Sequence, residues 1–400
     1  MRGMHNNIIR LKPREDRRLR AGHLWIFSNE IDTGATPLKG FEPGDLVFVE
    51  SSSGRRLGVG YINPHSLISV RLLSADPRER IDRAFLAARI GAALHWRERL
   101  GVGPYYRLIF GEADRLPGLV ADRYGDTLVA QVTTAGMERL LPDIIAALED
   151  VVRPANILLR NDTSSRVLEG LPRVVEDALG TPPAEAEVIE NGGRFRVSVR
   201  EGQKTGWFYD QRANRARIAH YAQGKRVLDL FAYVGGFGIQ AALAGAQEVM
   251  LVDASQRALA YAQENAAANG VGGKVSTQEG DVMAVLKSLR EEGRRFDLIV
   301  CDPPALIKRR KDQDEGIVAY QRLNQAALAV LGDDGILASA SCSHHLARDQ
   351  LARIVGQAAV RSGRPLQFIG EGGQGPDHPV HPAIAETAYL KLLLAHSIGS

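Results

Sequence analysis

Two segments in the second half of the chain place reactive side chains directly after short apolar runs. Residues 302–304 are Asp-Pro-Pro and follow the run 296–301, whereas Cys342 follows the run 335–341, 40 residues after Asp302. If the two runs form neighbouring strands of a parallel sheet, their ends lie about 5 Å apart. We therefore expect one pocket that holds both a carboxylic acid and a thiol.

An acid and a thiol in one pocket suit methylation at C5 of a pyrimidine, a carbon that is itself a poor nucleophile. A thiolate that adds to C6 makes the ring an enamine-like nucleophile, and an acid at N3 stabilises the charge that the ring accumulates. Cys342 would be the covalent catalyst, with Asp302 as proton donor or hydrogen-bond partner. Cys342 lies at a polar strand end, which favours a reactive thiolate, whereas Cys301 lies inside an apolar run and is expected to be inert.

Two other interpretations stay open. Asp-Pro-Pro is also typical of N-methylation of an exocyclic purine amine, although those enzymes usually have an aromatic residue next, where this chain has Ala305. The chain could also be a non-catalytic RNA-binding or ribosome-assembly protein that keeps the fold without the reaction. His344 and His345 have no accompanying ligand set, so no metal site is expected.

Polar residues at the ends of the earlier apolar runs indicate a nucleotide-like cofactor, because ligands bind at the carboxyl ends of strands in an open α/β sheet. Asp229 lies in the first run, and Gly235 and Gly236 form the turn after it, where glycine lets the backbone approach a ligand. Asp253 ends the second run, 24 residues after Asp229, and is placed to accept both ribose hydroxyls. Asp281, after a third run, is placed to reach an adenine amino group.

The glycine-rich turn favours S-adenosylmethionine (SAM) over NAD. An NAD site needs the spacing Gly-x-Gly-x-x-Gly to hold a pyrophosphate, and residues 235–238 read Gly-Gly-Phe-Gly instead. A ligand without phosphate groups, such as SAM, does not need a turn with that glycine spacing. We therefore predict SAM as the cofactor.

The spacing of apolar runs predicts an α/β fold for the C-terminal half. Between residues 226 and 342, short runs bounded by Gly, Asp or Pro alternate with helix-like segments. This alternation favours βαβ units and a mostly parallel, Rossmann-like sheet. Residues 387–395 are expected to form the final buried strand, after a Pro-rich loop at 377–382.

Length and composition are those of a globular protein with more than one domain. The 400 residues are 44% hydrophobic and 24% charged, and we place domains at 1–74, 75–187 and 188–400, with residues 181–187 as a linker. Two cysteines give no disulfide framework and suit the cytoplasm. The N-terminus has no apolar h-region, so no signal peptide is expected, and no apolar run reaches 18 residues, so no membrane span is expected.

Residues 1–74 are expected to form a β-rich module, and residues 75–187 a middle α+β domain. The strands predicted in the module are 8–11, 46–50, 57–61 and 68–73. In the middle domain, apolar spacing predicts a helix over 81–100 and a strand over 105–110. The turn-dense segment 111–125 either shapes a path for RNA or is a hairpin that packs the domains together.

Basic residues are concentrated in two places, although the net charge is only +3. Because that charge is small, affinity for nucleic acid must come from such local patches. Seven basic side chains lie between Arg2 and Arg20, and another cluster begins at Lys308, just beyond the Asp-Pro-Pro segment. The residues that we predict to contact RNA phosphates are Arg10, Lys12, Arg17, Arg18 and Lys308.

Four segments of the chain, 204–212, 229–236, 302–304 and 341–343, resemble the bacterial RlmI-type family. These are SAM-dependent methyltransferases similar to the enzyme that makes 5-methylcytosine in 23S rRNA. The resemblance covers nearly the whole chain and implies a class I SAM methyltransferase domain behind an N-terminal PUA-like RNA-binding domain. It also implies an RNA partner, either 23S rRNA or a large-subunit particle. A homodimer is one of the oligomeric states that the sequence allows.

The resemblance also implies roles for single residues. Cys342 corresponds to the nucleophile of the Ser-Cys-Ser motif, and Asp302 to the acid of Asp-Pro-Pro. Lys204 is implied to border the cofactor pocket and to contact RNA, and Gln211 and Arg212 to hold the methionine end of SAM. The full set of residues expected to bind SAM is Gln211, Arg212, Asp229, Phe231, Tyr233, Gly235, Gly236, Asp253, Ala254, Asp281, Val282 and Asp302.

Overall fold

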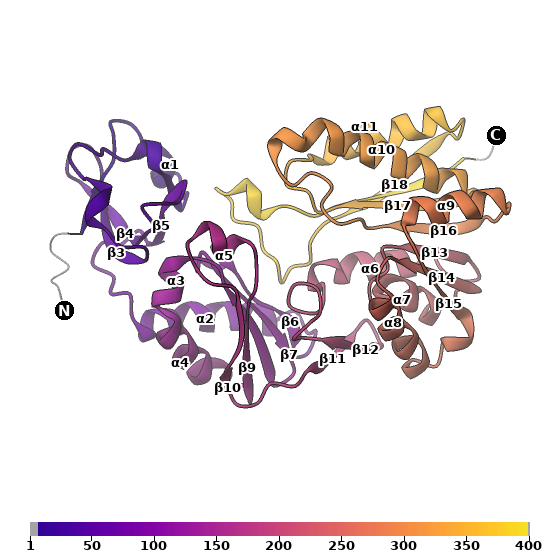
Figure 1. Cartoon of the computed structure of the whole chain (residues 1–400), viewed down its shortest axis with the longest axis horizontal. Helices are drawn as coiled ribbons and strands as arrows, with labels where there is room; N and C mark the ends of the chain where they lie inside the picture. Colours follow the sequence, from indigo (N-terminus) through magenta and orange to yellow (C-terminus); the bar gives the residue numbers. More distant parts are fainter. Residues whose placement is uncertain (1–6, 399–400) are drawn as a thin grey trace. The chain divides into compact units, whose positions relative to one another are not determined.

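The computed structural model describes residues 7–398, which divide into two compact units (Figure 1). The first unit contains residues 7–186, 198–207 and 377–387, and the second contains residues 187–197, 208–376 and 388–398. Each unit therefore combines segments that are far apart in the sequence. The three-domain division expected from the sequence stays a prediction, and Arg2 of the basic run lies outside the described residues.

A five-stranded sheet surrounds a small apolar core in the N-terminal part of the first unit. Its elements are β1 (Ile8–Arg10), α1 (Arg17–Arg20), β2 (Trp25–Phe27), η2 (Ser28–Glu30), η3 (Leu38–Gly40), β3 (Asp45–Glu50), β4 (Arg56–Ile62) and β5 (Ile68–Ser74). The strand order is β1-β3-β4-β5-β2, and β1 and β3 are the parallel pair. The four strands predicted here are confirmed, and β2 is an additional edge strand.

A second five-stranded sheet, with the order β10-β9-β8-β7-β6, fills the rest of the first unit. Its elements are α2 (Arg83–Glu98), β6 (Tyr105–Phe110), η4 (Gly111–Asp114), β7 (Leu119–Tyr124), β8 (Thr127–Val132), α3 (Ala135–Arg139), α4 (Leu141–Val152), β9 (Asn156–Asn161), α5 (Ser165–Leu168), β10 (Val174–Leu179) and η8 (Ala385–Thr387). The predicted helix and the predicted strand β6 are confirmed.

The segment 111–125 is more regular than its turn-dense sequence indicated, because residues 119–124 form β7 and residues 111–114 form η4. Leu119 and Ala121 are fully buried in this strand. Asp122 is also buried, and its carboxylate accepts hydrogen bonds from the Arg107 guanidinium at 2.6 and 2.9 Å. Because this strand buries an ion pair, its sequence contains a charged residue at a buried position. The alternation of apolar and polar residues that usually identifies a strand is therefore not visible in the sequence.

The second unit is built on a seven-stranded sheet with the order β15-β14-β13-β16-β17-β19-β18. Its strands are β13 (Arg226–Leu230), β14 (Glu248–Asp253), β15 (Val275–Glu279), β16 (Phe296–Cys301), β17 (Leu331–Ser341), β18 (Leu366–Gly372) and β19 (Lys391–Ser397). The first five are parallel, whereas β19 runs antiparallel to both β17 and β18. This arrangement confirms the predicted, mostly parallel sheet.

Helices cover both faces of this sheet (Figure 1). They are η5 (Tyr209–Gln211), α6 (Arg212–Ala219), α7 (Gly236–Leu243), α8 (Gln256–Ala268), η6 (Gly272–Lys274), α9 (Val282–Glu291), η7 (Arg310–Asp312), α10 (Gln313–Ala329) and α11 (Arg348–Arg361). Leu228 and Leu230 pack on the side of α9, α10 and α11, whereas Val227 packs on the side of α6, α7 and α8. A strand buried on both faces reads as a continuous apolar run, which explains the sequence pattern.

One segment predicted as a linker, residues 181–187, is partly a strand. The two-stranded sheet of β11 (Glu185–Glu190) and β12 (Gly193–Ser198) begins inside it. The prediction was wrong at these positions because alternate residues Ala186 and Val188 are buried despite their charged neighbours. None of the helices within residues 7–398 combines the length and apolarity that crossing a membrane requires.

Candidate active site

Two reactive side chains follow neighbouring strands at the carboxyl edge of the parallel sheet. β16 pairs with β13 on one side and with β17 on the other, in the register Leu230–Cys301 and Cys301–Ser339. Asp302 directly follows β16 and Cys342 directly follows β17, so the predicted adjacency of these two strands is confirmed. Asp302 and Cys342 are half-buried, whereas Cys301 is fully buried. An accessible thiol and a carboxyl group therefore follow neighbouring strand ends.

The turn after β13 has a strained backbone. Phe231 and Tyr233 have positive φ angles of 62° and 51°, and Gly235 has a φ of 85°. Positive φ angles are uncommon for residues other than glycine and concentrate at functional sites. A Cβ atom on Gly235 would lie 2.7 Å from Ile239, so this position requires glycine. The Tyr233 N–H donates to Asp253 Oδ2 at 2.9 Å, which fixes the turn against the end of β14.

Asp229 has a buried carboxylate oxygen that lacks a partner within the described part of the chain. Its Oδ2 accepts a hydrogen bond from the Gly238 N–H at 2.9 Å, while Oδ1 is buried without one. The pKa of Asp229 is raised to about 7, mainly by burial, and the negative charges of Asp302 and Asp253 contribute to this shift. Buried polar atoms normally have partners. The α-ammonium group of SAM is a donor of the required kind, so this site fits the predicted cofactor.

Asp253 keeps hydrogen-bonding capacity for a ligand. Its Oδ1 accepts from the Ser255 N–H at 2.9 Å, and its Oδ2 accepts from the Tyr233 N–H. Because each carboxylate oxygen has two lone pairs, both oxygens can still accept from a pair of ribose hydroxyls. Ala254, the next residue, is exposed. These positions are compatible with the ribose role predicted for Asp253.

Asp281 caps the helix that follows β15. Its Oδ1 accepts from the Ala284 N–H at 3.0 Å at the start of α9, and its side chain is exposed. Val282 is buried directly behind it. The cap fixes the carboxylate at the carboxyl edge of the sheet, next in strand order to Asp253.

Gln211 and Arg212 are held by different polar partners. The Gln211 side chain is buried and donates from Nε2 to Asp302 Oδ2 at 2.8 Å, while its Oε1 accepts from Asn214 at 2.6 Å. This buried amide fixes the orientation of the Asp302 carboxylate. The Arg212 guanidinium pairs with the buried Glu190 at 3.3 Å, so part of its charge is already matched.

The loop that carries Cys342 is fixed by a tyrosine. The Tyr320 hydroxyl lies 2.8 Å from Ser341 Oγ and 3.0 Å from Ser343 Oγ, so it bridges the two serines around the cysteine. Ser343 Oγ also accepts from the Ile307 N–H at 3.1 Å. The segment after Asp-Pro-Pro is therefore tied to the cysteine loop.

A buried lysine lies beside the same loop. Lys391 faces Ser341 in the β17–β19 pairing and donates from Nζ to Ser343 O at 2.6 Å and Tyr389 O at 2.8 Å. No carboxylate among residues 7–398 forms an ion pair with it. Burial lowers the pKa of Lys391 to about 8, and the nearby thiol of Cys342 opposes that shift.

Sequence reasoning missed Tyr320 and Lys391. For Lys391 there was a signal, because a lysine inside the apolar run 387–395, which we predicted to be buried, is rare without a special role. For Tyr320 there was none, since its place on α10 gives no indication of the loop that its hydroxyl reaches.

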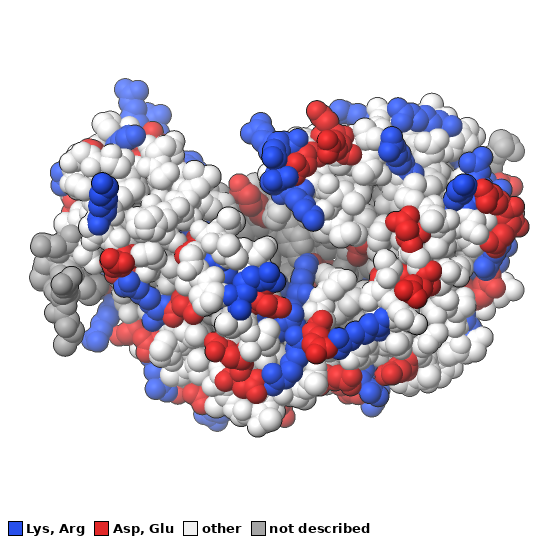
Figure 2. Space-filling model, viewed as in Figure 1, with Lys and Arg blue, Asp and Glu red and all other residues white. Residues whose placement is uncertain are grey.

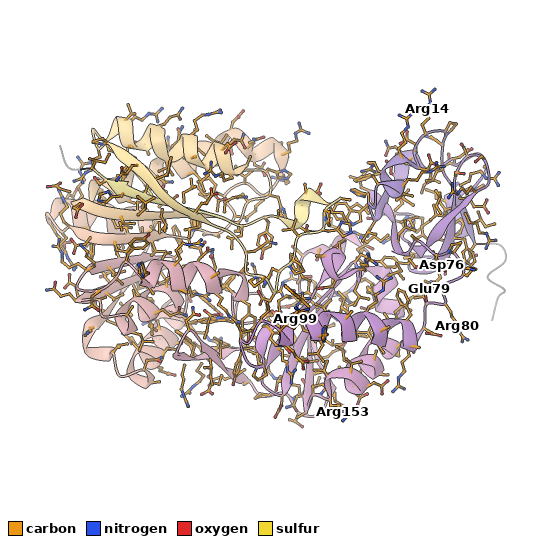
Figure 3. The ribbon with its side chains drawn as sticks, turned by 180° about the vertical axis from the view of Figure 1, so that it is seen from behind. Arg14, Asp76, Glu79, Arg80, Arg99 and Arg153 are labelled. Atoms are coloured by element: carbon orange, nitrogen blue, oxygen red, sulfur yellow. The ribbon has the colours of Figure 1, made fainter. Side chains whose placement is uncertain are left out.

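The residues predicted to contact RNA lie in both units. In the first unit, Arg10 pairs with Glu50 at 3.3 Å and Arg18 with Glu30 at 2.5 Å, while Lys12 donates to the Asn29 carbonyl at 2.8 Å. Arg17 is exposed on α1, and Figure 3 shows the neighbouring Arg14 pointing away from this module. Lys204, with a φ of 51°, also belongs to the first unit, whereas Lys308 is exposed in the second. Their contacts with RNA stay predictions.

The Pro-rich loop 377–382 makes structural contacts inside the first unit. Asp377 is buried, and its Oδ2 accepts from the Arg107 N–H at 3.0 Å. The Arg97 guanidinium donates to the Asp377 carbonyl oxygen at 2.9 Å. These bonds give the loop a structural role inside the first unit.

Two family models match the sequence. A PUA-like domain matches residues 9–75, and an S-adenosylmethionine-dependent methyltransferase matches residues 171–394. The second match spans more than half of the chain and includes β13, β16 and β17 with the residues that follow them.

Curated relatives match over nearly the full length. The ribosomal RNA large subunit methyltransferase I of Shewanella denitrificans is 40% identical over 395 residues, which cover 97% of this chain and 98% of the relative. The protein of the same name from Erwinia tasmaniensis is 37% identical over 390 residues, covering 96% and 97%.

Solved structures show the same fold. A candidate SAM-dependent methyltransferase from Streptococcus mutans superposes with a TM-score of 0.81 at 20% identity, over 97% of this chain and 99% of that one. A second structure, in complex with SAH, has a TM-score of 0.82 at 20% identity and the same coverage.

We predict that replacing the buried carboxyl group of Asp229 makes stability less dependent on pH. The folded-state pKa of about 7 lies above the ordinary value near 3.8, so the stability from this group is complete below about pH 4. That stability is lost as the pH rises through 7, by at most about 4 kcal/mol. Thermal unfolding of the cofactor-free protein between pH 5 and 8 should therefore fall more steeply for the wild type than for Asp229→Asn.

Asp297→Asn is the matched control, because the Arg226 guanidinium lowers the pKa of Asp297. Its contribution is present above about pH 4 and does not change between pH 5 and 8. Equal slopes for wild type and Asp229→Asn would show that Asp229 is ionised throughout this range.

Proposed function

Because this chain belongs to the S-adenosylmethionine-dependent methyltransferase family, we propose that it methylates C5 of a cytosine in 23S rRNA. The observation that carries the proposal is the meeting of Cys342 and Asp302 at neighbouring strand ends, next to the turn that follows Asp229. The relatives named ribosomal RNA large subunit methyltransferase I support the choice of large-subunit rRNA. The thiol favours C5 over a nitrogen as the methylated atom, because N-methylation needs no covalent catalyst.

The cofactor supplies an electrophilic methyl group on a positively charged sulfur. Asp229 would accept from its ammonium group through the unpartnered Oδ1, and Asp253 would accept from its ribose hydroxyls. Asp281 would reach the adenine amino group. The remaining residues that we propose to line the pocket are Gln211, Arg212, Phe231, Tyr233, Gly235, Gly236, Ala254 and Val282.

The Cys342 thiolate acts as the nucleophile toward the base. Its sulfur forms a bond to C6, the C5–C6 double bond opens, and C5 gains the methyl group. Asp302, oriented by Gln211, hydrogen bonds at N3, where the ring accumulates charge. Solvent water then accepts the C5 proton, the electrons of the C5–H bond re-form the C5–C6 double bond, and the C6–sulfur bond breaks, which restores the thiolate.

Lys391 would act as a positioning residue that favours this thiolate. Its ammonium group, held by two carbonyl oxygens, lies near Cys342 without a carboxylate among the described residues to neutralise it. A nearby positive charge stabilises a thiolate over a thiol. Tyr320 would keep the loop in place by bridging both neighbouring serines.

RNA binding would involve both units. The PUA-like module offers Arg10, Lys12, Arg17 and Arg18 for phosphate contact, with Arg10 and Arg18 oriented by their glutamate partners. Lys204 and Lys308 are proposed as further contacts. The substrate is free 23S rRNA or a large-subunit particle, which places the protein in the cytoplasm.

The product identifies the reaction. Purified protein is incubated with methyl-tritiated SAM and total rRNA from a strain that lacks the gene, and the RNA is digested to nucleosides. We expect the label in 5-methylcytidine from 23S rRNA. Label in a methylated purine would instead support N-methylation and leave Cys342 without a catalytic role.

We predict that Cys342→Ala lowers methylation by roughly 10³-fold or more, because a covalent catalyst has no substitute in the pocket. Binding of SAM, measured by calorimetry, should stay close to that of the wild type. Cys301→Ala is the matched control: it removes the other thiol, which is fully buried, and should retain activity. Methylation at the normal rate by Cys342→Ala would contradict the mechanism.

Lys391→Met should alter how activity depends on pH. In the wild type, kcat/KM should rise as the thiol ionises and fall above about pH 8 as Lys391 loses its proton. Without the ammonium group, the rising limb should move to higher pH by about one unit or more, and the falling limb should disappear. Lys274→Met, at an exposed position, should keep the wild-type profile. A profile unchanged in Lys391→Met would exclude a role in thiolate formation.

A further inference from the structure

A groove in the second unit is lined by six basic side chains and no acidic one. It lies between α9, the second half of α10 and the end of α11, and has a volume of about 680 Å³. Figure 2 shows Lys and Arg side chains over these helices, with Asp and Glu side chains among them. The basic residues are Lys287, Arg290, Arg295, Arg322, Arg361 and Arg364.

The basic end of the groove lies at the opposite edge of the sheet from the candidate active site. Arg295 directly precedes β16, and Asp302 directly follows it. A six-residue strand rises about 3.3 Å per residue, so the two edges are roughly 20 Å apart. The groove therefore cannot hold the base that is methylated.

Most of the positive charge in the groove is unmatched. Within residues 7–398, no carboxylate forms an ion pair with Arg290, Arg295, Arg322 or Arg361. The other two have only distant partners, since Lys287 lies 3.9 Å from Glu291 and Arg364 lies 3.6 Å from Asp333.

Some exposed arginines elsewhere in the described residues are paired closely. Arg83 contacts Asp150 at 2.5 Å, and Arg348 contacts Glu371 at 2.6 Å. None of the five arginines of the groove has so close a carboxylate partner within residues 7–398. Like charges that share one concavity repel one another, and an anionic ligand would offset this cost.

Helix dipoles explain only part of the cluster. Basic residues are favourable in the last turn of a helix, and Arg290 and Arg361 occupy such positions on α9 and α11. Arg322, however, lies inside α10, and Arg295 and Arg364 lie outside helices. Capping therefore does not account for the convergence of six cations on one groove.

We propose that this groove binds the phosphodiester backbone of the substrate RNA, at a site separate from the methylated base. The inference rests on RNA being the substrate. Guanidinium groups match phosphate oxygens in geometry and stay charged at any relevant pH. Because the groove lies far from the chemistry, its contacts should strengthen RNA binding and leave the rate of methyl transfer at saturating RNA unchanged.

The test compares two triple variants of the full chain. The groove variant carries Arg290→Gln, Arg322→Gln and Arg361→Gln. The control variant carries Arg99→Gln, Arg153→Gln and Arg353→Gln, which remove the same charge at exposed positions outside the groove; Figure 3 labels Arg99 and Arg153. Calorimetry with SAM checks that both variants are folded.

Binding to 23S rRNA is measured by filter retention between 50 and 200 mM KCl. For the groove variant, we expect a higher Kd, a slope of log K against log salt that is smaller by about 2–3, and an unchanged kcat. A Kd and slope equal to those of the control variant would overturn the proposal.

A second substrate separates failure of this inference from failure of the proposed function. A short RNA that carries only the target nucleotide and its immediate neighbours cannot span about 20 Å from the active site into the groove. The groove variant should bind and methylate it like the wild type, and a loss on this RNA too would overturn the proposal. Absence of methylation by the wild type on this RNA, on 23S rRNA and on large-subunit particles would instead contradict the proposed function.

Discussion

The parallel pairing of β16 between β13 and β17 is the constraint on which the candidate site depends. Each of these strands is buried on both faces, so its register is fixed by side chains that cannot move to solvent. The three carboxyl ends consequently meet at one edge. A shift of one residue in β17 would turn Ser341 from its contact with Tyr320 and move Cys342 away from Asp302. Packing of the core thus determines where the reactive side chains lie relative to one another.

Polar groups around this edge hold the loops where apolar packing ends. Tyr320 ties both sides of the cysteine loop together, and Gln211 fixes the carboxylate that follows β16. Two groups are kept in environments that oppose their usual charge, since burial raises the pKa of Asp229 and lowers that of Lys391. Titratable groups perturbed in opposite directions beside one strand edge are typical of active sites.

Motif and spacing predicted the reactive groups but not the residues that position them. Cys342 and Asp302 follow apolar runs whose pairing could be anticipated, because parallel strands joined by helices tend to be neighbours. Tyr320 could not be found in the same way, since a helix residue is related to a distant loop only through packing. Lys391 could have been noticed, because a lysine in a buried strand must be offset by special partners.

The strand β7 shows where prediction of the fold from the sequence failed. Its sequence carries Asp122 at a position buried by an ion pair, so a period of apolar residues is absent although the strand is present. The basic groove between α9, α10 and α11 was equally hidden, because its residues are scattered over nearly eighty positions and converge only through helix packing. Sequence patterns report local periodicity, whereas pairing of charges depends on tertiary structure.

Trapping the covalent adduct tests the role of Cys342 most directly. RNA that contains 5-fluorocytidine in place of cytidine can accept the methyl group, but it cannot lose fluorine from C5, so the C6–sulfur bond persists. With SAM present, we predict a protein–RNA complex that survives denaturation, with Cys342 in the cross-linked peptide. Methylation of ordinary rRNA without such a complex, or a complex linked through another residue, would contradict the proposed mechanism.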